Sequence, residues 1–271
     1  MVQRDDLELW LNDFLSAQSV QDYAPNGLQI EGRERIERVA TAVSVTQEVI
    51  DAAVEAGAHA LVVHHGLFWK NENPVLRRYR RRRVRSILEA ELNLFAYHLP
   101  LDLHPRISHN RLILEGVGAS RVLTPEEYIR ELLPGGKPGE GTGEWPEQVS
   151  RFGLAGLFDP PVPVAELVGR VDRFLGGKAD SFRFGHDPVS RLFVVSGGGR
   201  NELDRVLPLG VDAYLTGEAR EATPSVAREA GITYIYGGHY RTERPGIIRL
   251  GEEIARAFPV EARFLDVENP L

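Results

Sequence analysis

The chain has 271 residues, with 32 Lys and Arg against 39 Asp and Glu, which leaves a formal net charge of −7. Hydrophobic residues make up 42% of the chain and charged residues 26%, which excludes a disordered chain and a fibrous protein. The absence of Cys excludes disulfides, thiolate metal sites and Cys nucleophiles. Any bound metal must therefore be held by His, Asp and Glu.

Composition also bears on location and partners. No apolar run reaches the roughly 18 residues that a membrane-spanning helix needs, and the first residues are too acidic and too polar for a signal peptide. We therefore expect a cytoplasmic protein with no membrane partner. The acidic total disfavours a general nucleic-acid binder.

Helical and strand patterns alternate in the first half of the chain. A predicted helix over 4–17 places its apolar residues on one face, namely Leu7, Trp10, Leu11, Phe14 and Leu15. Ser44 and Gln47 predict a capping box for the next helix, which ends near Gly57. The other predictions are strands over 39–43, 60–63 and 94–97, helices over 74–91 and 108–116, and a helix beginning at 124–127.

A Gly- and Pro-rich segment follows, with five Gly between Pro134 and Pro146. It predicts a linker or exposed loop over 134–149, between a first α/β lobe at 1–133 and a second α/β segment at 150–271. Strand and helix patterns resume beyond it. We expect strands over 152–154, near 182, and over 192–195, 213–215, 233–236 and 263–265, and helices over 164–175, 202–207, 219–230 and 242–258. Repeated strand–helix units predict an α/β fold of two lobes with helices on the sheet faces.

Two adjacent His follow one of the predicted buried strands. His64 and His65 come directly after Leu61–Val63. Functional groups of α/β proteins gather at the carboxyl ends of strands. Because neighbouring residues of a regular strand point to opposite faces, we expect the chain to leave strand geometry at this pair, which Gly66 permits.

A second candidate segment follows the predicted strand over 94–97. Pro100 and Pro105 forbid a plain helix there, and Asp102 between them is a candidate metal ligand. The alternative is that Asp102 caps or turns the chain. His98 is a candidate acid–base group or a residue that orients a ligand, with a structural hydrogen bond as the alternative.

The third candidate segment begins with Gly237 and Gly238. If a helix begins near His239, then His239 and Glu243 lie at i and i+4 on one face. That spacing suits two ligands of one site, although the same pattern is common as a surface pair.

The three segments together point to a metal centre more strongly than any one of them. They offer nitrogen and carboxylate ligands that suit zinc, iron or manganese, namely His64, His65, Asp102, His239 and Glu243. Five ligands exceed what one tetrahedral catalytic site uses, which predicts two divalent metal ions per chain with Glu243 as the bridge. Two metals about 3.5–4 Å apart can activate a shared water and polarise a substrate oxygen.

These segments resemble the signatures of the Nif-three-like dinuclear metal-centre family, whose members are often named GTP cyclohydrolase 1 type 2 homologues. The matching segments are 62–69, 97–102 and 237–244, together with Asn26–Gln29 and Leu215–Glu218. The resemblance implies metal ligands at the five residues above, with Glu243 bridging. It also implies two interlocked α/β lobes with mixed sheets and a ring-like homohexamer.

We therefore hypothesise a metal-dependent hydrolase that acts on a nucleotide-like or phosphorylated small molecule. Glu243 and His98 are its candidate catalytic residues, and GTP ring opening is one candidate reaction. One alternative is a metal-handling or regulatory hexamer without turnover. Another is a ring that binds single-stranded nucleic acid.

Two further segments each allow more than one interpretation. Seven of the nine residues from Arg77 to Arg85 are Arg, which predicts a solvated helix face, a phosphate-binding or intersubunit surface, or a nucleic-acid patch that the acidic total disfavours. Ser196–Gly199 lies between a predicted strand and a helix. It predicts a tight turn, with a phosphate cradle as the less favoured alternative.

Overall fold

The computed structural model describes residues 1–133, 150–267 and 269–271, so the predicted linker at 134–149 lies outside the described residues. Contacts divide the chain into two compact units. Unit 1 comprises Met1–Ser108 and Arg244–Asn269, and unit 2 comprises His109–Glu243 and Pro270–Leu271. Each unit is built on a mixed sheet flanked by helices, which confirms the predicted α/β fold class.

The sheet of unit 1 has the strand order β13-β4-β5-β6-β2. Strands β13 (Glu261–Phe264), β4 (Arg38–Ser44), β5 (Ala60–His65) and β6 (Asn93–Ala96) run parallel, and β2 (Gly27–Ile30) is antiparallel to β6. A small separate ladder pairs β1 (Val2–Gln3) with β3 (Arg35–Ile36).

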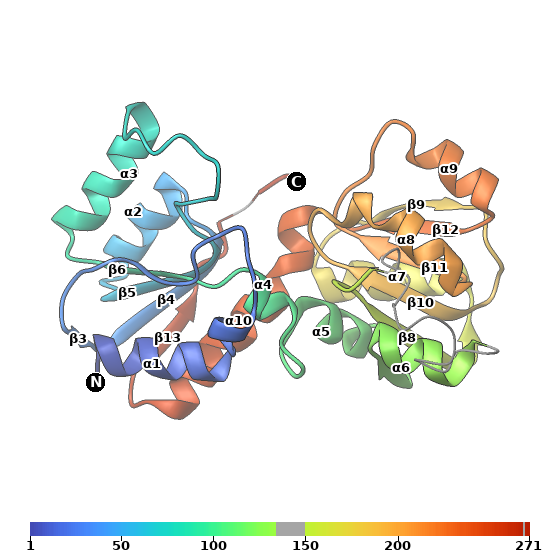
Figure 1. Cartoon of the computed structure of the whole chain (residues 1–271), viewed down its shortest axis with the longest axis horizontal. Helices are drawn as coiled ribbons and strands as arrows, with labels where there is room; N and C mark the ends of the chain where they lie inside the picture. Colours follow the sequence, from blue (N-terminus) through green and yellow to red (C-terminus); the bar gives the residue numbers. More distant parts are fainter. Residues whose placement is uncertain (134–149, 268) are drawn as a thin grey trace. The chain divides into compact units, whose positions relative to one another are not determined.

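Helices cover both faces of this sheet (Figure 1). On one face lie α2 (Gln47–Glu55) and α3 (Arg78–Glu89), and on the other lie α1 (Arg4–Phe14) and the unit 1 part of α10 (His239–Ala257). The remaining elements of unit 1 are short: η1 (Ala17–Ser19) and α4 (Leu99–Asp102). Alternation along β5 explains the layering, because Leu61 and Val63 pack with Ile50 of α2 and Ile87 of α3 in one core cluster.

The sheet of unit 2 has the strand order β7-β8-β10-β11-β12-β9. Strands β10 (Val189–Val195), β11 (Ala213–Thr216) and β12 (Thr233–Tyr236) run parallel. The outer strands β7 (Arg121–Leu123), β8 (Leu154–Val162) and β9 (Asp180–Arg183) pair antiparallel with their neighbours.

Alternation along β10 sorts the helices of unit 2. Leu192 and Val194 pack with α5 (His109–Gly116) and α7 (Val164–Leu175) in one core cluster. Phe193 and Val195 point to the other face, where the second cluster includes residues of α6 (Pro125–Leu132), α8 (Leu203–Val206) and α9 (Thr223–Ala230). Two single 3-10 turns, η2 (Gly199–Asn201) and η3 (Leu207–Leu209), flank α8.

The compact units group the chain differently from the predicted lobes 1–133 and 150–271. Residues 109–133 pack with unit 2, because β7 pairs with β8. The end of α10 and β13 pack with unit 1, because β13 extends the sheet at β4. Long-range strand pairing therefore decides the grouping.

Some predicted helix and strand bounds agree with the structure, and one predicted helix cap does not. The helix over 164–175 and the strand over 233–236 are confirmed to the residue as α7 and β12. The predicted capping box at Ser44 is wrong: the N-cap of α2 is Thr46, whose side chain accepts from the Val49 amide. Ser44 instead ends β4 and contacts His65.

No helix among the described residues has both the length and the apolar character needed to cross a bilayer.

Helix α1 provides a matched test of the core. Leu11 is fully buried, whereas Leu9 on the same helix is 68% exposed. We expect Leu11→Ala to lower the free energy of unfolding by about 2–5 kcal/mol because it leaves a cavity. Leu9→Ala should change it by less than about 0.5 kcal/mol. Urea unfolding of both variants checks this, and equal losses would contradict the assigned face of α1.

Candidate metal centre

The candidate residues of unit 1 stand at the carboxyl ends of three adjacent parallel strands. β4 ends at Ser44, β5 ends at His65, and β6 ends at Ala96, two residues before His98. This edge is where α/β sheets place their ligands. Strand β5 extends through both His, so the expectation that the chain leaves strand geometry at the pair is wrong. The pairing of β5 with β6 nevertheless ends at Val63, so His64 lies beyond the last paired residue.

Three imidazole rings cluster at this edge. The ring centroids of His64 and His65 are 4.5 Å apart, those of His64 and His98 are 4.9 Å apart, and those of His65 and His98 are 5.6 Å apart. Each ring offers one nitrogen within 4.8 Å of the others. His64 is fully buried and His98 is 6% exposed. Such spacing allows several nitrogens to bind one cation.

Hydrogen bonds to Nδ1 orient the two adjacent rings. His64 Nδ1 lies 3.1 Å from the carbonyl oxygen of Tyr97. Because a carbonyl only accepts, His64 carries its proton on Nδ1 and presents Nε2 as an electron-pair donor. His65 Nδ1 lies 2.9 Å from Ser44 Oγ, a hydroxyl that either donates or accepts. Ligating His residues in metalloproteins are typically anchored in this way.

His98 is held by a buried carboxylate that the sequence analysis missed. Its Nδ1 lies 3.0 Å from Asp22 Oδ1, and Asp22 also accepts from the Leu99 amide and from Asn26 Nδ2. Burial alone would raise the pKa of Asp22, but the hydrogen bonds from His98, Asn26 and Leu99 outweigh it and hold the pKa well below its usual range. Asp22 is therefore ionised and keeps the His98 proton on Nδ1.

Asp102 approaches the same cluster. It is the last residue of α4, and its Oδ2 lies 3.7 Å from His64 Nε2. Pro100 occupies the first turn of α4, which fixes the start of this short helix. Asp102 is therefore not the N-terminal cap of a helix, and its carboxylate faces the nitrogen that His64 presents.

Two amide side chains brace the backbone behind the cluster. Asn26 Oδ1 accepts from the His98 amide at 2.8 Å, and Gln29 Oε1 accepts from the Leu67 amide at 2.8 Å. A side chain at Gly66 would bring a Cβ within 2.3 Å of Gln29 Oε1. The Asn26–Gln29 segment thus secures the backbone after His65 and at His98.

The candidate residues of unit 2 also follow parallel strands. Helix α10 begins at His239, three residues after β12 ends, which confirms the expected i and i+4 relation of His239 and Glu243. His239 Nε2 lies 3.2 Å from Glu243 Oε1, and Glu243 is 4% exposed. A ring nitrogen and a carboxylate oxygen therefore converge from one helix face.

Glu218 anchors His239 from the end of the neighbouring strand β11. Glu218 Oε1 lies 2.5 Å from His239 Nδ1, and its other oxygen pairs with Arg200. A carboxylate only accepts, so His239 donates from Nδ1 to Glu218, and its Nε2 faces Glu243 Oε1. No local sequence pattern marks Arg200 as a partner of Glu218.

The Ser196–Gly199 segment leaves room for the Glu243 side chain and is not arranged as a phosphate cradle. Its first two amides donate elsewhere, Ser196 to Asn110 Oδ1 and Gly197 to Thr242 Oγ1, both within unit 2. Gly197 has φ +60°, and a Cβ there would lie 2.0 Å from Glu243 Oε1. The favoured prediction of a tight turn is confirmed, and its glycine is needed for the approach of Glu243.

The candidate residues thus form two groups, one in each unit. Unit 1 brings together His64, His65, His98 and Asp102, and unit 2 brings together His239 and Glu243. The acceptors that orient them, Asp22 and Glu218 above all, carry no local sequence pattern as partners. Asn26 and Glu218 were nevertheless within segments that the sequence marked.

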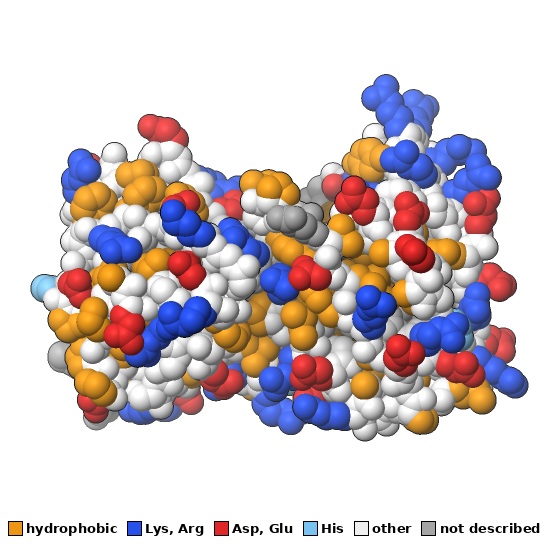
Figure 2. All heavy atoms as spheres, turned by 180° about the vertical axis from the view of Figure 1, so that it is seen from behind, with side chains coloured by type: hydrophobic (Ala, Val, Ile, Leu, Met, Phe, Trp, Pro, Cys, Tyr) orange, Lys and Arg blue, Asp and Glu red, His pale blue; other side chains and the backbone are white. Residues whose placement is uncertain are grey.

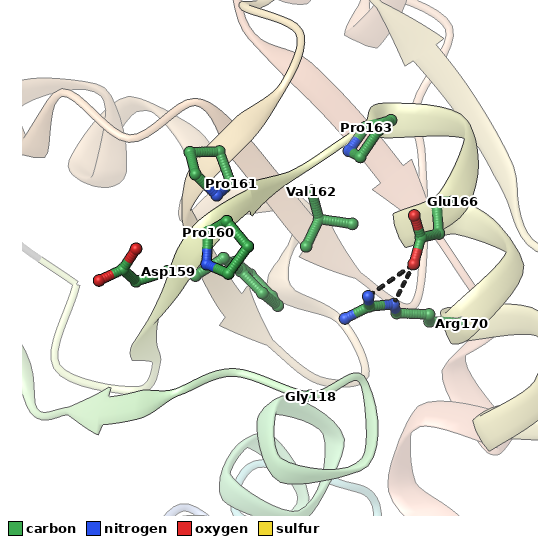
Figure 3. A pocket seen from close by; sticks show the side chains of 9 residues that line it. Gly118, Asp159, Pro160, Pro161, Val162, Pro163, Glu166 and Arg170 are labelled. Atoms are coloured by element: carbon green, nitrogen blue, oxygen red, sulfur yellow. Dashed lines mark hydrogen bonds and ion pairs between the residues drawn. The ribbon is translucent and has the colours of Figure 1, made fainter.

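A hollow elsewhere in unit 2 lacks comparable chemistry. It has a volume of about 330 Å³ and lies where β8 leads into α7 (Figure 3). Two of its charged side chains satisfy each other, because Arg170 donates to Glu166 Oε1 at 2.6 and 3.1 Å, and Arg170 also donates to the Val117 carbonyl. Asp159 and Pro160 line the opposite side. We assign no function to this hollow.

Comparisons with known proteins cover the whole chain. The family model Duf34/NIF3 (NGG1p interacting factor 3) matches residues 2–270. A Salmonella typhimurium protein named GTP cyclohydrolase 1 type 2 homolog is 36% identical over 273 residues, which is 99% of this chain and 100% of the relative. A Pseudomonas aeruginosa protein of the same name is 38% identical over 257 residues, covering 95% and 94%.

Solved structures agree in fold. The protein ybgI, described as of unknown function, superposes with a TM-score of 0.88 at 34% identity and covers 100% of both chains. A protein from Thermus thermophilus superposes with a TM-score of 0.83 at 27% identity, again over 100% of both chains. The chain therefore belongs to the Duf34/NIF3 family.

Proposed function

We propose that this protein is a metal-dependent hydrolase whose centre holds two divalent cations, zinc, iron or manganese. His64, His65, Asp102, His239 and Glu243 would supply the ligands. The substrate would be a nucleotide-like or phosphorylated small molecule. The observation that carries the proposal is the anchoring of Nδ1, which leaves His64 and His239 presenting Nε2 beside a carboxylate.

The donor set fits the proposed cations. Neutral imidazole and carboxylate ligands suit zinc, iron and manganese, whereas calcium prefers oxygen ligands alone. The candidate ligands of each unit include at least one imidazole and one carboxylate. When bound, two such cations would polarise a substrate oxygen and lower the pKa of a coordinated water.

The chain's own residues have separable tasks in this proposal. Glu243 has two carboxylate oxygens and would hold both cations. His98 is oriented by the Asp22 carboxylate, whose Oδ1 lies 3.0 Å from the ring Nδ1. We infer that His98 moves a proton at Nε2 while the five ligands hold the cations.

The names of the curated relatives favour one reaction within this class. Relatives at 35–38% identity over nearly the whole chain are named GTP cyclohydrolase 1 type 2 homolog. The first candidate reaction is GTP ring opening, in which water attacks the imidazole ring of guanine. Hydrolysis of a phosphate ester is the second.

Metal content tests the centre directly. We expect protein purified without added metal to contain about two cations per chain by elemental analysis. Glu243→Gln should lose at least one of them, because the amide is a poor bridging ligand. Glu252→Gln is the matched control, since Glu252 is an exposed residue of the same helix. Equal metal content in both variants, or wild-type protein that stays metal-free in excess zinc and manganese, would contradict the proposal.

Three glycines with nearly equal φ values isolate the role of Gly197. Gly197, Gly210 and Gly231 have φ of +60°, +62° and +63°, so each change to Ala imposes similar backbone strain of about 1 kcal/mol. Only Gly197→Ala places a Cβ against Glu243, since the other two positions have nothing within 4 Å. We expect Gly197→Ala to weaken zinc binding at least tenfold and the controls to bind normally. The same zinc affinity in all three variants would refute this role.

Turnover separates an enzyme from a protein that only handles metal. We expect metal-loaded protein to release formate from GTP, and His98→Gln to slow the release by about 10²–10⁴-fold without loss of metal. Absence of metal-dependent formate would eliminate GTP ring opening and leave phosphate-ester hydrolysis to be measured. A metal-handling protein would show neither reaction and would exchange its cations rapidly with a chelator.

The homohexamer stays a prediction from the family resemblance. Light scattering of the purified chain measures its assembly state, and a monomer at micromolar concentration would contradict it.

A further inference from the structure

A series of side-chain contacts runs across the carboxyl ends of three adjacent strands of unit 2. Glu218 follows β11, and its Oε1 lies 2.5 Å from Nδ1 of His239, which follows β12. The other oxygen of Glu218 pairs with Arg200, which lies in η2 after β10. One carboxylate therefore joins both side chains, so a residue that holds Arg200 in place also limits the rotation of Glu218.

An ion pair at this degree of exposure does not by itself fix a side chain. Arg200 and Glu218 have side chains that are 32% and 29% exposed. Cationic and anionic side chains are interspersed over unit 2 in the space-filling view (Figure 2, left), and such pairs ordinarily gain little because salt screens them and ordering costs entropy. Arg200 can order Glu218 only if the main chain is anchored at both residues.

Two buried tyrosines provide this anchoring. Tyr214 of β11 and Tyr234 of β12 are partners in the parallel register, and both are fully buried. The Tyr214 hydroxyl donates at 2.6 Å to the carbonyl oxygen of Gly199, directly before Arg200. The Tyr234 hydroxyl donates at 2.6 Å to the carbonyl oxygen of Glu218 itself. Burial raises the pKa of both hydroxyls, so they remain protonated donors.

The turn that carries Arg200 is packed tightly against the sheet. The carbonyl of Gly199 also accepts from the Glu202 amide at 2.8 Å. A Cβ at Gly199 would lie 2.7 Å from Thr216 Oγ1 and from the Cβ of Val195. The turn therefore lies directly against the ends of β10 and β11, which leaves its main chain little room to move.

The ring of His239 depends on such anchoring more than the ring of His64 does. Nδ1 of His64 contacts a main-chain carbonyl, whereas Nδ1 of His239 contacts a side chain that can itself rotate. If Glu218 turned away, the His239 ring would lose its acceptor and could rotate. Partners that orient a metal-binding His are typically worth about 10- to 100-fold in metal affinity.

We propose that Arg200 is a positioning residue, which together with the Tyr214 and Tyr234 hydroxyls fixes Glu218 and thereby directs His239. The effect on metal binding rests on the proposed function, whereas the orientation of His239 can be measured without any metal.

Three Arg variants of the full-length protein separate this role from a general effect of charge. Arg200→Gln removes the cation, and Arg200→Lys keeps it as the conservative change. Arg205→Gln is the matched control, because Arg205 belongs to the neighbouring helix α8 and pairs with a different carboxylate, Glu202, at 3.7 Å.

Two Tyr variants test the anchoring in the same way. Tyr234→Phe removes the hydroxyl that holds Glu218. Tyr128→Phe is its control, because Tyr128 is also fully buried in unit 2 and its hydroxyl also donates to a carbonyl oxygen, that of Leu209.

The first measurement follows the Nδ1 proton of His239 by NMR in metal-free protein with ¹⁵N-labelled His, assigned by its absence in His239→Gln. We expect a visible, protected signal in wild type and in both controls. Arg200→Gln and Tyr234→Phe should lose it through faster exchange with water, and Arg200→Lys should recover it. No protected signal in wild type, or an unchanged signal in Arg200→Gln, overturns the proposal.

The second measurement is zinc affinity, by competition with a chelating dye. Arg200→Gln should bind about tenfold more weakly, and both controls should bind about as wild type does. If Arg200 acted only by drawing charge from Glu218, its removal would strengthen the His239 donor, so equal or tighter binding in Arg200→Gln overturns the proposal. Wild-type protein that binds no zinc contradicts the proposed function, and the His239 signal then still decides the role of Arg200.

Discussion

The hydrogen bond on Nδ1 of each anchored imidazole is the constraint on which the proposed centre depends. A buried imidazole that gives its Nδ1 proton to a fixed acceptor cannot rotate without leaving that acceptor unpaired, which costs about 1–3 kcal/mol. For His64 the acceptor is the carbonyl of Tyr97, directly after the neighbouring strand β6. The pairing of β5 with β6 therefore sets the direction of Nε2. A slip of one residue in that pairing would turn the ring to the other face of the sheet.

The same constraint takes a different form in unit 2. There the acceptor is a side chain, Glu218, held in turn by Arg200. The carboxylate follows β11 and the imidazole follows β12, so the parallel register of these strands brings the two together. Gly197, after β10, completes the arrangement because only a residue without a Cβ lets Glu243 approach. Residues after three consecutive parallel strands thus leave space for Glu243, orient His239 and include His239 itself as a candidate ligand.

Much of this architecture was accessible from sequence because its signals are local. Apolar runs predicted the central strands, and polar residues directly after them predicted where ligands gather. The i and i+4 relation of His239 and Glu243 followed from the expected start of one helix. Asp22 was beyond such reasoning, since it contacts His98 from 76 positions away and no periodicity links the two. The capping prediction at Ser44 failed for a related reason: the hydroxyl has a more distant partner in His65.

Net charge does not describe the local charge of α3, because it is a sum over the whole chain. Electrostatic interactions depend on charges within a Debye length of one another. Seven Arg in nine residues must surround a helix if all point outward, and the sequence offers no means of deciding which turn back. The structure decides it through Glu72, which pairs with Arg80, and through Tyr79, which Arg83 covers. The other helical Arg side chains are exposed, namely Arg78, Arg81, Arg82 and Arg85, and Arg85 pairs with Glu89.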